Sequence, residues 1–416
     1  MKSYSGLRDS SHFPGSSQVR EFTQKSDPPV LPQHHLERAR QFLWVDEPAQ
    51  LQELASRLST ESRVAVDLEA DSLYRYRERI CLVQLCSSGV TALVDTLALG
   101  DLQPLRLMLE DASKEKVFHG ADYDLRLLKA VAGINPRGVF DTMVAAQCLG
   151  VRQLGLSDLL EARLGVRLEK KFQRADWGKR PLPQAMVQYA VEDTCYLLAL
   201  RDSLACELEA RGRMEWARGH FLNLEKIEPL RREPPDALRT HGARQLDDQG
   251  RAVLQALLEW REEEARRRDA PVFKILSTET LVLLAKERPR NLQAMLKTSG
   301  ITRKVLNLWG EALARAIEEG LRRPPLPLPR VPSYRQNPPG SRRRLLALKE
   351  IRDQKANQEG LPPGLLCPNS VLQALAITPP GEIQRRMEEL LRPWQLGLLG
   401  SAFVQALLGG GRKDRG

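Results

Sequence analysis

The sequence predicts a mixed α/β domain followed by two copies of a small helical domain, and three observations lead to this fold class. Between Phe42 and about Glu209, short strand-like runs of apolar residues alternate with helical segments. Beyond a proline-rich stretch from Glu228 to Thr240, the remaining pattern is helical. The helical half repeats itself at an offset of 91 residues, and a chain of 416 residues is too long for one ordinary core.

The α/β half begins with a helix and three strands that follow one another closely. We expect a helix at Leu51–Leu58 and strands at Arg63–Asp67, Ile80–Leu85 and Thr91–Val94. Two strand-helix units follow, with strands at Val117–His119 and Val139–Thr142 and a helix at Asp122–Val131. Because the early strands are joined by few residues and the later ones by a helix, a mixed sheet flanked by helices is expected.

Residues that recur at a fixed offset define the repeat in the helical half. Three of them are Arg261, Ala265 and Pro271, which recur as Arg352, Ala356 and Pro362. After one deletion the match resumes at an offset of 90, where Gly310 recurs as Gly400. Two copies of one helical domain explain this register. The proline-rich stretch Pro324–Pro339 between them is expected to be a semi-rigid spacer.

These patterns divide the chain into six segments. We expect a disordered N-terminal extension at 1–41, the α/β domain at 42–212, a helical and proline-rich linker at 213–244, the first helical domain at 245–323, a basic proline-rich linker at 324–341 and the second helical domain at 342–411.

The charge of the chain favours a polyanionic partner. The net charge is +10 and the pI is near 9.4, and ten Lys and Arg residues lie between Leu321 and Lys355 against two acids. Cationic side chains bind polyanions because each neutralised phosphate releases condensed counterions. No apolar run is long enough to span a bilayer, and Met1–Asp27 lacks the apolar centre of a secretion signal. We therefore expect a cytoplasmic protein without membrane contact.

The cysteines are scattered along the chain. They are Cys81, Cys86, Cys148, Cys195, Cys206 and Cys367. No two of them have C-x-x-C spacing, and none has a partnered histidine, which argues against a disulfide framework and against a zinc site. Buried free thiols are expected.

Two carboxylates stand at the end of a predicted strand. Asp67 and Glu69 are two residues apart, so both side chains leave the same face of the sheet. Adjacent carboxylates repel each other unless a positive charge lies between them, and hard oxygen ligands favour Mg²⁺ or Mn²⁺. A solvated strand end is the alternative, so this spacing alone does not establish a metal site.

Further acids follow at a strand-to-helix junction and within a helix. In the segment HGADYD, Asp122 is placed to cap the helix and Asp124 lies in its first turn, so either could be a ligand on local grounds. In the segment YAVED, Tyr189 and Asp193 are four residues apart, which puts both on one helix face. A half-buried tyrosine above a surface acid is the alternative for that pair.

Together the three motifs resemble those of the ribonuclease D family, the branch of the DEDD exonucleases with a tyrosine in its third motif. The family's D-x-E, lone Asp and Tyr-x-x-x-Asp motifs match Asp67 with Glu69, then Asp124, then Tyr189 with Asp193. The family's H-x-x-x-x-D form of the second motif fits His119 and selects Asp124 over Asp122.

Two further elements extend the resemblance over nearly everything after Phe42. The segment DWGKRP, Asp176–Pro181, looks like the family's Asp-Trp-x-x-Arg-Pro element. The two helical repeats are similar to HRDC domains, the modules shared by RecQ-type helicases and ribonuclease D. The resemblance thus implies a ribonuclease H-like (DnaQ-like) exonuclease domain followed by two HRDC-like domains.

The resemblance also implies an activity and its cofactors. The enzyme would hydrolyse RNA from the 3′ end to nucleoside 5′-monophosphates, with precursor tRNA as a substrate. Apart from the resemblance, we expect a monomer. Two divalent ions, Mg²⁺ or Mn²⁺, would activate a water and hold the leaving 3′ oxygen. In the family pattern Asp67 bridges both ions, Glu69 and Asp193 complete the first site, and Asp124 serves the second. Tyr189 is expected to orient the attacking water, because a free tyrosine, with a pKa of about 10, is a poor base.

Aromatic and cationic side chains are the candidate RNA contacts. They are Trp177, Lys179, Arg180, Arg266, Arg267, Arg268, Arg342, Arg343 and Arg344. The alternative places Trp177 in the core and the cations on a solvated surface.

Two other functions fit parts of this pattern. A DNA exonuclease is compatible with the carboxylates, which do not exclude deoxyribose, and HRDC-like units occur in DNA helicases. A non-catalytic RNA-binding scaffold would keep the fold without turnover. The lack of a polymerase or helicase segment disfavours the first alternative, and the five intact motif residues disfavour the second.

Overall fold

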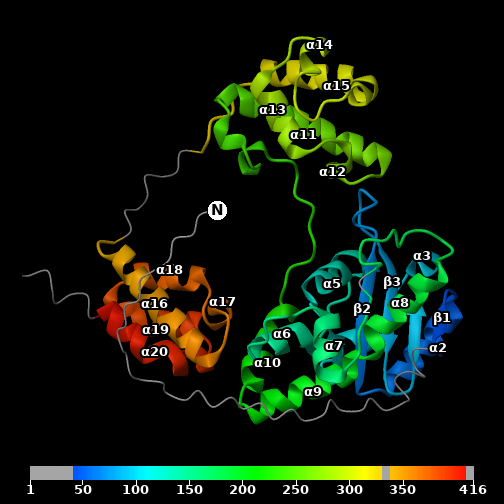
Figure 1. Cartoon of the computed structure of the whole chain (residues 1–416), viewed down its shortest axis with the longest axis vertical. Helices are drawn as coiled ribbons and strands as arrows, with labels where there is room; N and C mark the ends of the chain where they lie inside the picture. Colours follow the sequence, from blue (N-terminus) through cyan, green and yellow to red (C-terminus); the bar gives the residue numbers. More distant parts are fainter. Residues whose placement is uncertain (1–40, 170, 330–337, 409–416) are drawn as a thin grey trace, which may run out of the picture.

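A six-stranded mixed sheet forms the centre of the N-terminal domain (Figure 1). The computed structural model describes residues 41–169, 171–329 and 338–408. The expected N-terminal extension and much of the second proline-rich linker lie outside these residues. Where the chain is described, we find no helix with the length and apolar character needed to cross a membrane.

The strand order is β1-β4-β3-β2-β5-β6. The strands are β1 (Leu43–Val45), β2 (Arg63–Ala70), β3 (Ile80–Cys86), β4 (Thr91–Val94), β5 (Glu115–Phe118) and β6 (Val139–Asp141). The pairs β2–β3 and β3–β4 are antiparallel, whereas β1–β4, β2–β5 and β5–β6 are parallel. The mixed sheet expected from the sequence is therefore confirmed.

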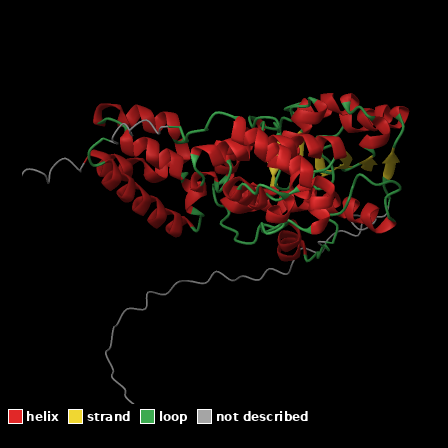
Figure 2. Ribbon diagram, turned by 90° about the horizontal axis from the view of Figure 1, so that it is seen from above, coloured by secondary structure: helices red, strands yellow, loops and turns green. Residues whose placement is uncertain are grey.

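Helices lie on both sides of this sheet (Figure 2). They are α2 (Pro48–Ser59), α3 (Thr96–Leu99), α4 (Gln103–Glu110), α5 (Asp122–Leu127), α6 (Thr142–Cys148), α7 (Leu156–Leu164), α8 (Gln184–Cys195), α9 (Leu197–Ala210) and α10 (Met214–Glu225). Side chains alternate between the two faces of a strand. Accordingly Val64 and Val66 of β2 pack in one core with residues of α2, α4 and α5, and Ala65 packs in another with α8 and α9.

The helix α10 belongs to the nuclease core, although the sequence assigned its residues to a linker. Ala217 and Phe221 are buried, and the ring centroid of Phe221 lies 4.8 Å from that of Phe140 in β6. The irregular segment that leads away from the domain begins only after Glu225. All six cysteines are free, and Cys206 is exposed, contrary to the expectation that all are buried.

The two helical domains have the same order of helices. The first contains α11 (Asp248–Arg268), α12 (Val272–Ile275), α13 (Thr278–Glu287), α14 (Leu292–Met295) and α15 (Arg303–Arg322). The second contains α16 (Ser341–Glu359), α17 (Pro363–Leu366), α18 (Asn369–Ile377), α19 (Ile383–Leu390) and α20 (Pro393–Leu408).

A buried arginine makes the same kind of hydrogen bond in each helical domain. Arg261 donates to the carbonyl oxygen of Leu276 at 3.0 Å, and Arg352, 91 positions later, donates to the carbonyl oxygen of Cys367 at 3.1 Å. Each guanidinium thus ties the first helix of its domain, α11 or α16, to the turn that precedes the third, α13 or α18. The repeat seen in the sequence is therefore a repeat of structure.

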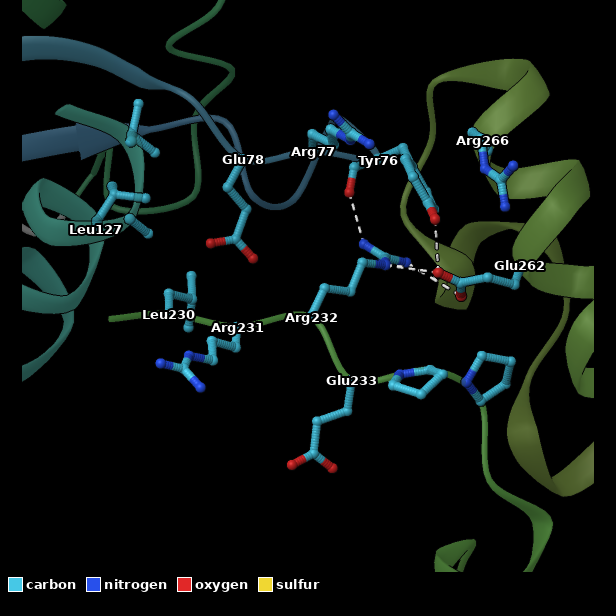
Figure 3. Close-up of a pocket in the computed structure, with 14 residues that line it drawn as sticks. Tyr76, Arg77, Glu78, Leu127, Leu230, Arg231, Arg232, Glu233, Glu262 and Arg266 are labelled. Atoms are coloured by element: carbon cyan, nitrogen blue, oxygen red, sulfur yellow. Dashed lines mark hydrogen bonds and ion pairs between the residues drawn. The ribbon is translucent and has the colours of Figure 1, made fainter. Parts of the chain in front are cut away.

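The loop between β2 and β3 joins the nuclease domain to the first helical domain (Figure 3). Tyr76 from this loop is buried in the core of the helical domain, and its hydroxyl donates to Glu262 at 2.6 Å. Arg232 of the connecting segment stacks on the Tyr76 ring at 3.9 Å and pairs with Glu262. A cavity of about 720 Å³ opens beside this junction, with Arg77 and Arg266 among its lining residues (Figure 3).

The second helical domain contacts α10 of the nuclease domain. Trp216 of α10 stacks on Trp394, with ring centroids 4.8 Å apart. Arg213 donates to the carbonyl oxygen of Glu359 at 2.9 Å. Both helical domains therefore have direct contacts with the domain that carries the acidic motifs.

Candidate active site

Three of the predicted carboxylates meet above one face of the sheet. Asp67 and Glu69 come from the second half of β2, and Asp193 comes from α8, which lies across that face. One carboxylate oxygen from each residue lies within 4.8 Å of the others. This convergence follows from the period of two in β2, which points Asp67 and Glu69 to the same side.

The fourth carboxylate is Asp124, and the structure separates it from Asp122. Asp124 lies in the first turn of α5, is 8% exposed and is close enough to Asp67 for that charge to raise its pKa. Asp122 is exposed and pairs with Arg126 at 2.8 Å. Asp122 is also the first helical residue rather than the cap expected from the sequence, because Ala121 occupies the capping position.

The turn that presents Asp124 is held by Asp141 at the end of β6. The Asp141 carboxylate accepts hydrogen bonds from the backbone N–H of Gly120 at 3.1 Å and of Ala121 at 2.8 Å. It also caps α6. His119 lies beside it, 2.9 Å from the Thr142 hydroxyl, and burial lowers its pKa. The histidine of the second motif therefore shapes the turn in this structure and makes no part of the acid cluster.

Tyr189 stands one helical turn before Asp193 on α8 and points to the same cluster. Its ring packs against Phe172, with centroids 5.8 Å apart, and against Trp177, with centroids 6.2 Å apart. Burial raises the pKa of Tyr189 well above its usual range, and the charge of Asp193 and a hydrogen bond to it act in the same direction. The hydroxyl is therefore poised to donate a hydrogen bond rather than to accept a proton as a base.

The four acids repel one another in a poorly solvated site. Burial raises the pKa of Asp67 to about 7 and that of Asp193 to about 8. Burial, and then the charges of Asp67, Asp193 and Asp124, raise the pKa of Glu69 to about 10. The pKa of Asp124 is also raised by burial and by the neighbouring charge of Asp67. Each raised pKa means that the ionised carboxylate is destabilised, because no positive charge compensates for its burial and for its acidic neighbours.

The donor set fits divalent cations that prefer oxygen. Among the described residues, no Lys or Arg forms an ion pair with any of the four acids. All the converging ligand atoms are carboxylate oxygens, the ligands that Mg²⁺ and Mn²⁺ prefer. A protein cation would already have lowered these pKa values, so the cluster is suited to positive charge from outside the chain.

Two of the predicted RNA contacts near the active site are structural instead. Trp177 is 1% exposed and belongs to the core under α8, so it cannot stack on a nucleotide in this structure. Arg180 binds both carboxylate oxygens of Asp95, at 2.6 and 2.7 Å, and donates to three backbone carbonyls. Lys179, the cation next to Arg180, is exposed at 77% of its side chain.

In the arginine runs of the helical domains, some side chains also bind other parts of the protein. Arg267 and Arg268 both bind Glu264, and Arg344 donates to the carbonyl oxygen of Ala376 at 2.8 Å. Arg266, Arg267, Arg268, Arg342 and Arg343 are all exposed, and Arg266 lies 3.1 Å from Glu263. Because Arg267 and Arg268 are held by the buried carboxylate of Glu264, Arg266, Arg342, Arg343 and Lys179 stay candidates for contact with RNA.

The fold and the acid cluster define a class of enzyme, the 3′-5′ exonucleases. Residues 42–209 match the family described as 3′-5′ exonuclease, and residues 250–317 and 341–407 match the HRDC domain. The chain is 30% identical to ribonuclease D of Gluconacetobacter diazotrophicus over 356 residues, which are 83% of this chain and 88% of that protein. It is 35% identical to ribonuclease D of Zymomonas mobilis over 291 residues, which are 68% of this chain and 74% of that protein.

A solved structure agrees over the whole described architecture. The crystal structure of Escherichia coli RNase D, described as an exoribonuclease involved in structured RNA processing, matches with a TM-score of 0.67 and 26% identity. The match covers 89% of this chain and 99% of that one. The chain belongs to the ribonuclease D family, and it is a 3′-5′ exoribonuclease of that type with two HRDC domains.

Proposed function

We propose that this chain trims structured RNA from its 3′ end, releasing nucleoside 5′-monophosphates, and that 3′ trailers of precursor tRNA in the cytoplasm are among its substrates. The observation that carries the proposal is the cluster of Asp67, Glu69, Asp124 and Asp193, with which no Lys or Arg in the described part of the chain forms an ion pair. Two divalent ions held there would supply an activated water and stabilise the leaving 3′ oxygen.

The acids of the cluster and the aromatic residues beside it have different roles in this proposal. The charge of Asp67 raises the pKa of each of the other three acids, Glu69, Asp124 and Asp193. This central position suits a ligand shared by both ions. Tyr189 keeps its proton and orients the attacking water through its hydroxyl. Trp177 and Phe172 fix the ring, so the hydroxyl has little freedom to leave that position.

Turnover of a single-stranded oligoribonucleotide tests the proposal. We expect Mg²⁺- or Mn²⁺-dependent release of 5′-monophosphates in order from the 3′ end, and none in the presence of a chelator. A deoxyribonucleotide of the same sequence is the matched substrate. Faster turnover of the DNA would favour a DNA exonuclease, and no turnover of either would favour a non-catalytic RNA-binding scaffold.

We also propose that the HRDC domains hold the folded part of the RNA while its 3′ tail reaches the acids. Support comes from the exposed cations Arg266, Arg342 and Arg343 and from the direct contacts of both domains with the nuclease domain. Escherichia coli RNase D, whose structure matches, is described as acting in structured RNA processing.

A truncation that ends near Thr240 separates this role from catalysis. It should still degrade a short unstructured oligonucleotide, whereas its affinity for a folded tRNA precursor should fall. The salt dependence of binding should flatten as well, because fewer phosphates are neutralised. Tyr76 loses its partner in this truncation, so a full-length Arg266→Ala, Arg342→Ala, Arg343→Ala variant is the matched control. Equal affinities and equal salt slopes would assign these domains to something other than RNA.

A further inference from the structure

Gln84 is a polar side chain in the middle of the apolar strand β3. It is 0% exposed, and neither Nε2 nor Oε1 has a hydrogen-bond partner among the described residues. Buried amides are almost always paired in folded proteins, because an unpaired one loses its hydrogen bonds to water and gains nothing in return. An unpaired buried amide beside a functional site therefore calls for a ligand or a partner that appears when the site is in use.

The register of the sheet places Gln84 directly opposite Asp67. The two residues are Cα partners in the antiparallel β2–β3 pair, and the next pair along is Glu69 with Leu82. Residues opposite each other in such a pair project from the same face, with Cβ atoms about 4.5–5.5 Å apart. The Gln84 amide thus lies beside the carboxylate that interacts with all three other acids.

Gln84 cannot act on the RNA itself. Its face of β3 is covered by α8, whose Ala190 and Val191 are fully buried in the same core as Leu82. Any influence on the reaction must therefore pass through a neighbouring side chain. Its two neighbours in register are Leu93 of β4, which cannot accept a hydrogen bond through its side chain, and Asp67, which can and is a predicted metal ligand.

An amide suits this position better than a cation would. A neutral N–H donor stabilises an ionised carboxylate, whereas a Lys or Arg would supply the positive charge itself and compete with a metal ion. A carboxylate has about four lone-pair positions, so Asp67 can bind ions and still accept one hydrogen bond from the side. Ligating carboxylates commonly have such a partner, which fixes their orientation.

We propose that Gln84 is a positioning residue, whose side-chain amide donates a hydrogen bond to the Asp67 carboxylate when that carboxylate holds a divalent ion. This inference rests on the proposed function of the acid cluster. It predicts that Gln84 lowers the stability of the metal-free protein, in which its amide is unpaired. It also predicts that Gln84 raises the affinity for metal, because the amide is paired in the metal-bound state.

The test compares Gln84→Met with Leu82→Met. Methionine keeps the length of Gln84 and removes both unpaired atoms, and Leu82→Met makes a volume-conserving change on the same strand and face, opposite Glu69. Calorimetric titration with Mn²⁺ in the absence of RNA gives the metal affinity, and thermal melting of the metal-free protein gives the stability. We expect Gln84→Met to melt at or above the wild-type temperature and to bind Mn²⁺ about 10- to 100-fold more weakly. Leu82→Met should bind Mn²⁺ like wild type.

Steady-state kinetics on an oligoribonucleotide at fixed Mn²⁺ add a second readout. We expect Gln84→Met to lower kcat while the KM for RNA stays within a factor of two, since Gln84 does not touch RNA. If Gln84→Met does not fold, Gln84→Leu provides the same comparison. In the wild-type protein labelled with ¹⁵N-glutamine, one side-chain amide resonance should also shift when Mg²⁺ is added.

The outcomes separate this inference from the proposed function. Wild-type Mn²⁺ affinity and wild-type kcat in Gln84→Met, or no shifted glutamine amide in the wild-type protein, would overturn the role of Gln84 alone. Undetectable Mn²⁺ binding by the wild-type protein, or unchanged binding by Asp67→Asn, would overturn the metal site on which the role depends.

Discussion

Glu69 in the nuclease domain is half-buried and Glu264 in the first HRDC domain is buried, yet the surroundings of the two carboxylates are opposite. Glu69 lies among Asp67, Asp124 and Asp193, and burial together with these charges raises its pKa to about 10. Glu264 accepts hydrogen bonds from two arginines, Arg267 and Arg268, and from the indole N–H of Trp309 at 2.7 Å. These bonds, the one from Arg267 first, lower the pKa of Glu264 to about 2.

The difference shows which charges the fold needs for itself. Around Glu264 the protein provides every partner, so the arginine run there stabilises the HRDC domain before it can contact anything else. Around Glu69 the described residues provide further acids and no Lys or Arg partner, which is a cost in stability unless cations from outside bind. A site of the second kind is the one that an enzyme using divalent ions requires.

The largest effect is expected from removing one charge of the acid cluster. Asp67→Asn or Asp193→Asn should abolish exonuclease turnover with Mg²⁺, because the shared ligands of the ions are lost. The fold should remain intact, since each change also removes repulsion. Gel assays of an end-labelled oligoribonucleotide measure the rate, and near-normal activity in either variant would contradict the assignment of two metal ions.

Tyr189→Phe keeps the ring against Phe172 and Trp177 and removes only the hydroxyl. We expect the rate to fall by about 10²- to 10⁴-fold, the range usual for a group that positions a proton-transfer step. Affinity for RNA should be nearly unchanged. A rate within a factor of two of wild type would make Tyr189 a packing residue only.

The two aspartates of α5 should differ sharply. Asp124→Ala should lose at least about 100-fold in rate, because it removes a ligand of a metal or of its bound water. Asp122→Ala removes only an exposed pair with Arg126, which is worth about 0.3–0.5 kcal/mol, and should turn over RNA like wild type. The opposite ranking would show that Asp122 is the functional acid.

Glu264→Gln should have the opposite effect to the active-site variants: the protein should lose stability and keep its exonuclease activity. Hydrogen bonds to a charged group contribute about 1.5–3 kcal/mol, so the first HRDC domain should become less stable while a short oligonucleotide is degraded at the wild-type rate. The pKa of Glu264 is depressed in the folded state, so its contribution is present above about pH 4.5 and is lost as the pH falls towards 2. Denaturant melts of wild type and variant at pH 7 and pH 3 measure this, and an equal difference at both values would contradict it.

The sequence predicted the elements whose signals are local. The run RVAVD and the spacing of Asp67 and Glu69 defined both the strand and the face, and the spacing of Tyr189 and Asp193 defined the helix face, because each follows from the period of its element. The repeated Arg261 and Arg352 were visible because two copies of one domain preserve the same contacts.

Partners distant in the sequence could not be predicted. Arg180 reads as a surface cation next to Lys179, but its partner Asp95 lies 85 residues earlier. Gln84 reads as one polar residue in a buried strand until the pairing of β3 with β2 places it opposite Asp67. The role of α10 was missed because its burial depends on β6 and α6, which its own residues do not reveal.

Thermal melting of wild type, Asp67→Asn and Glu264→Gln, each without metal and with Mn²⁺, tests the central claim most directly. If the acid cluster is a site for external cations, Asp67→Asn melts at or above wild type without metal and gains nothing from Mn²⁺, which binds and stabilises only an intact site. Glu264→Gln melts lower in both conditions and keeps the wild-type gain from Mn²⁺. A metal-free Asp67→Asn protein that melts below wild type and yet gains as much from Mn²⁺ would contradict the account.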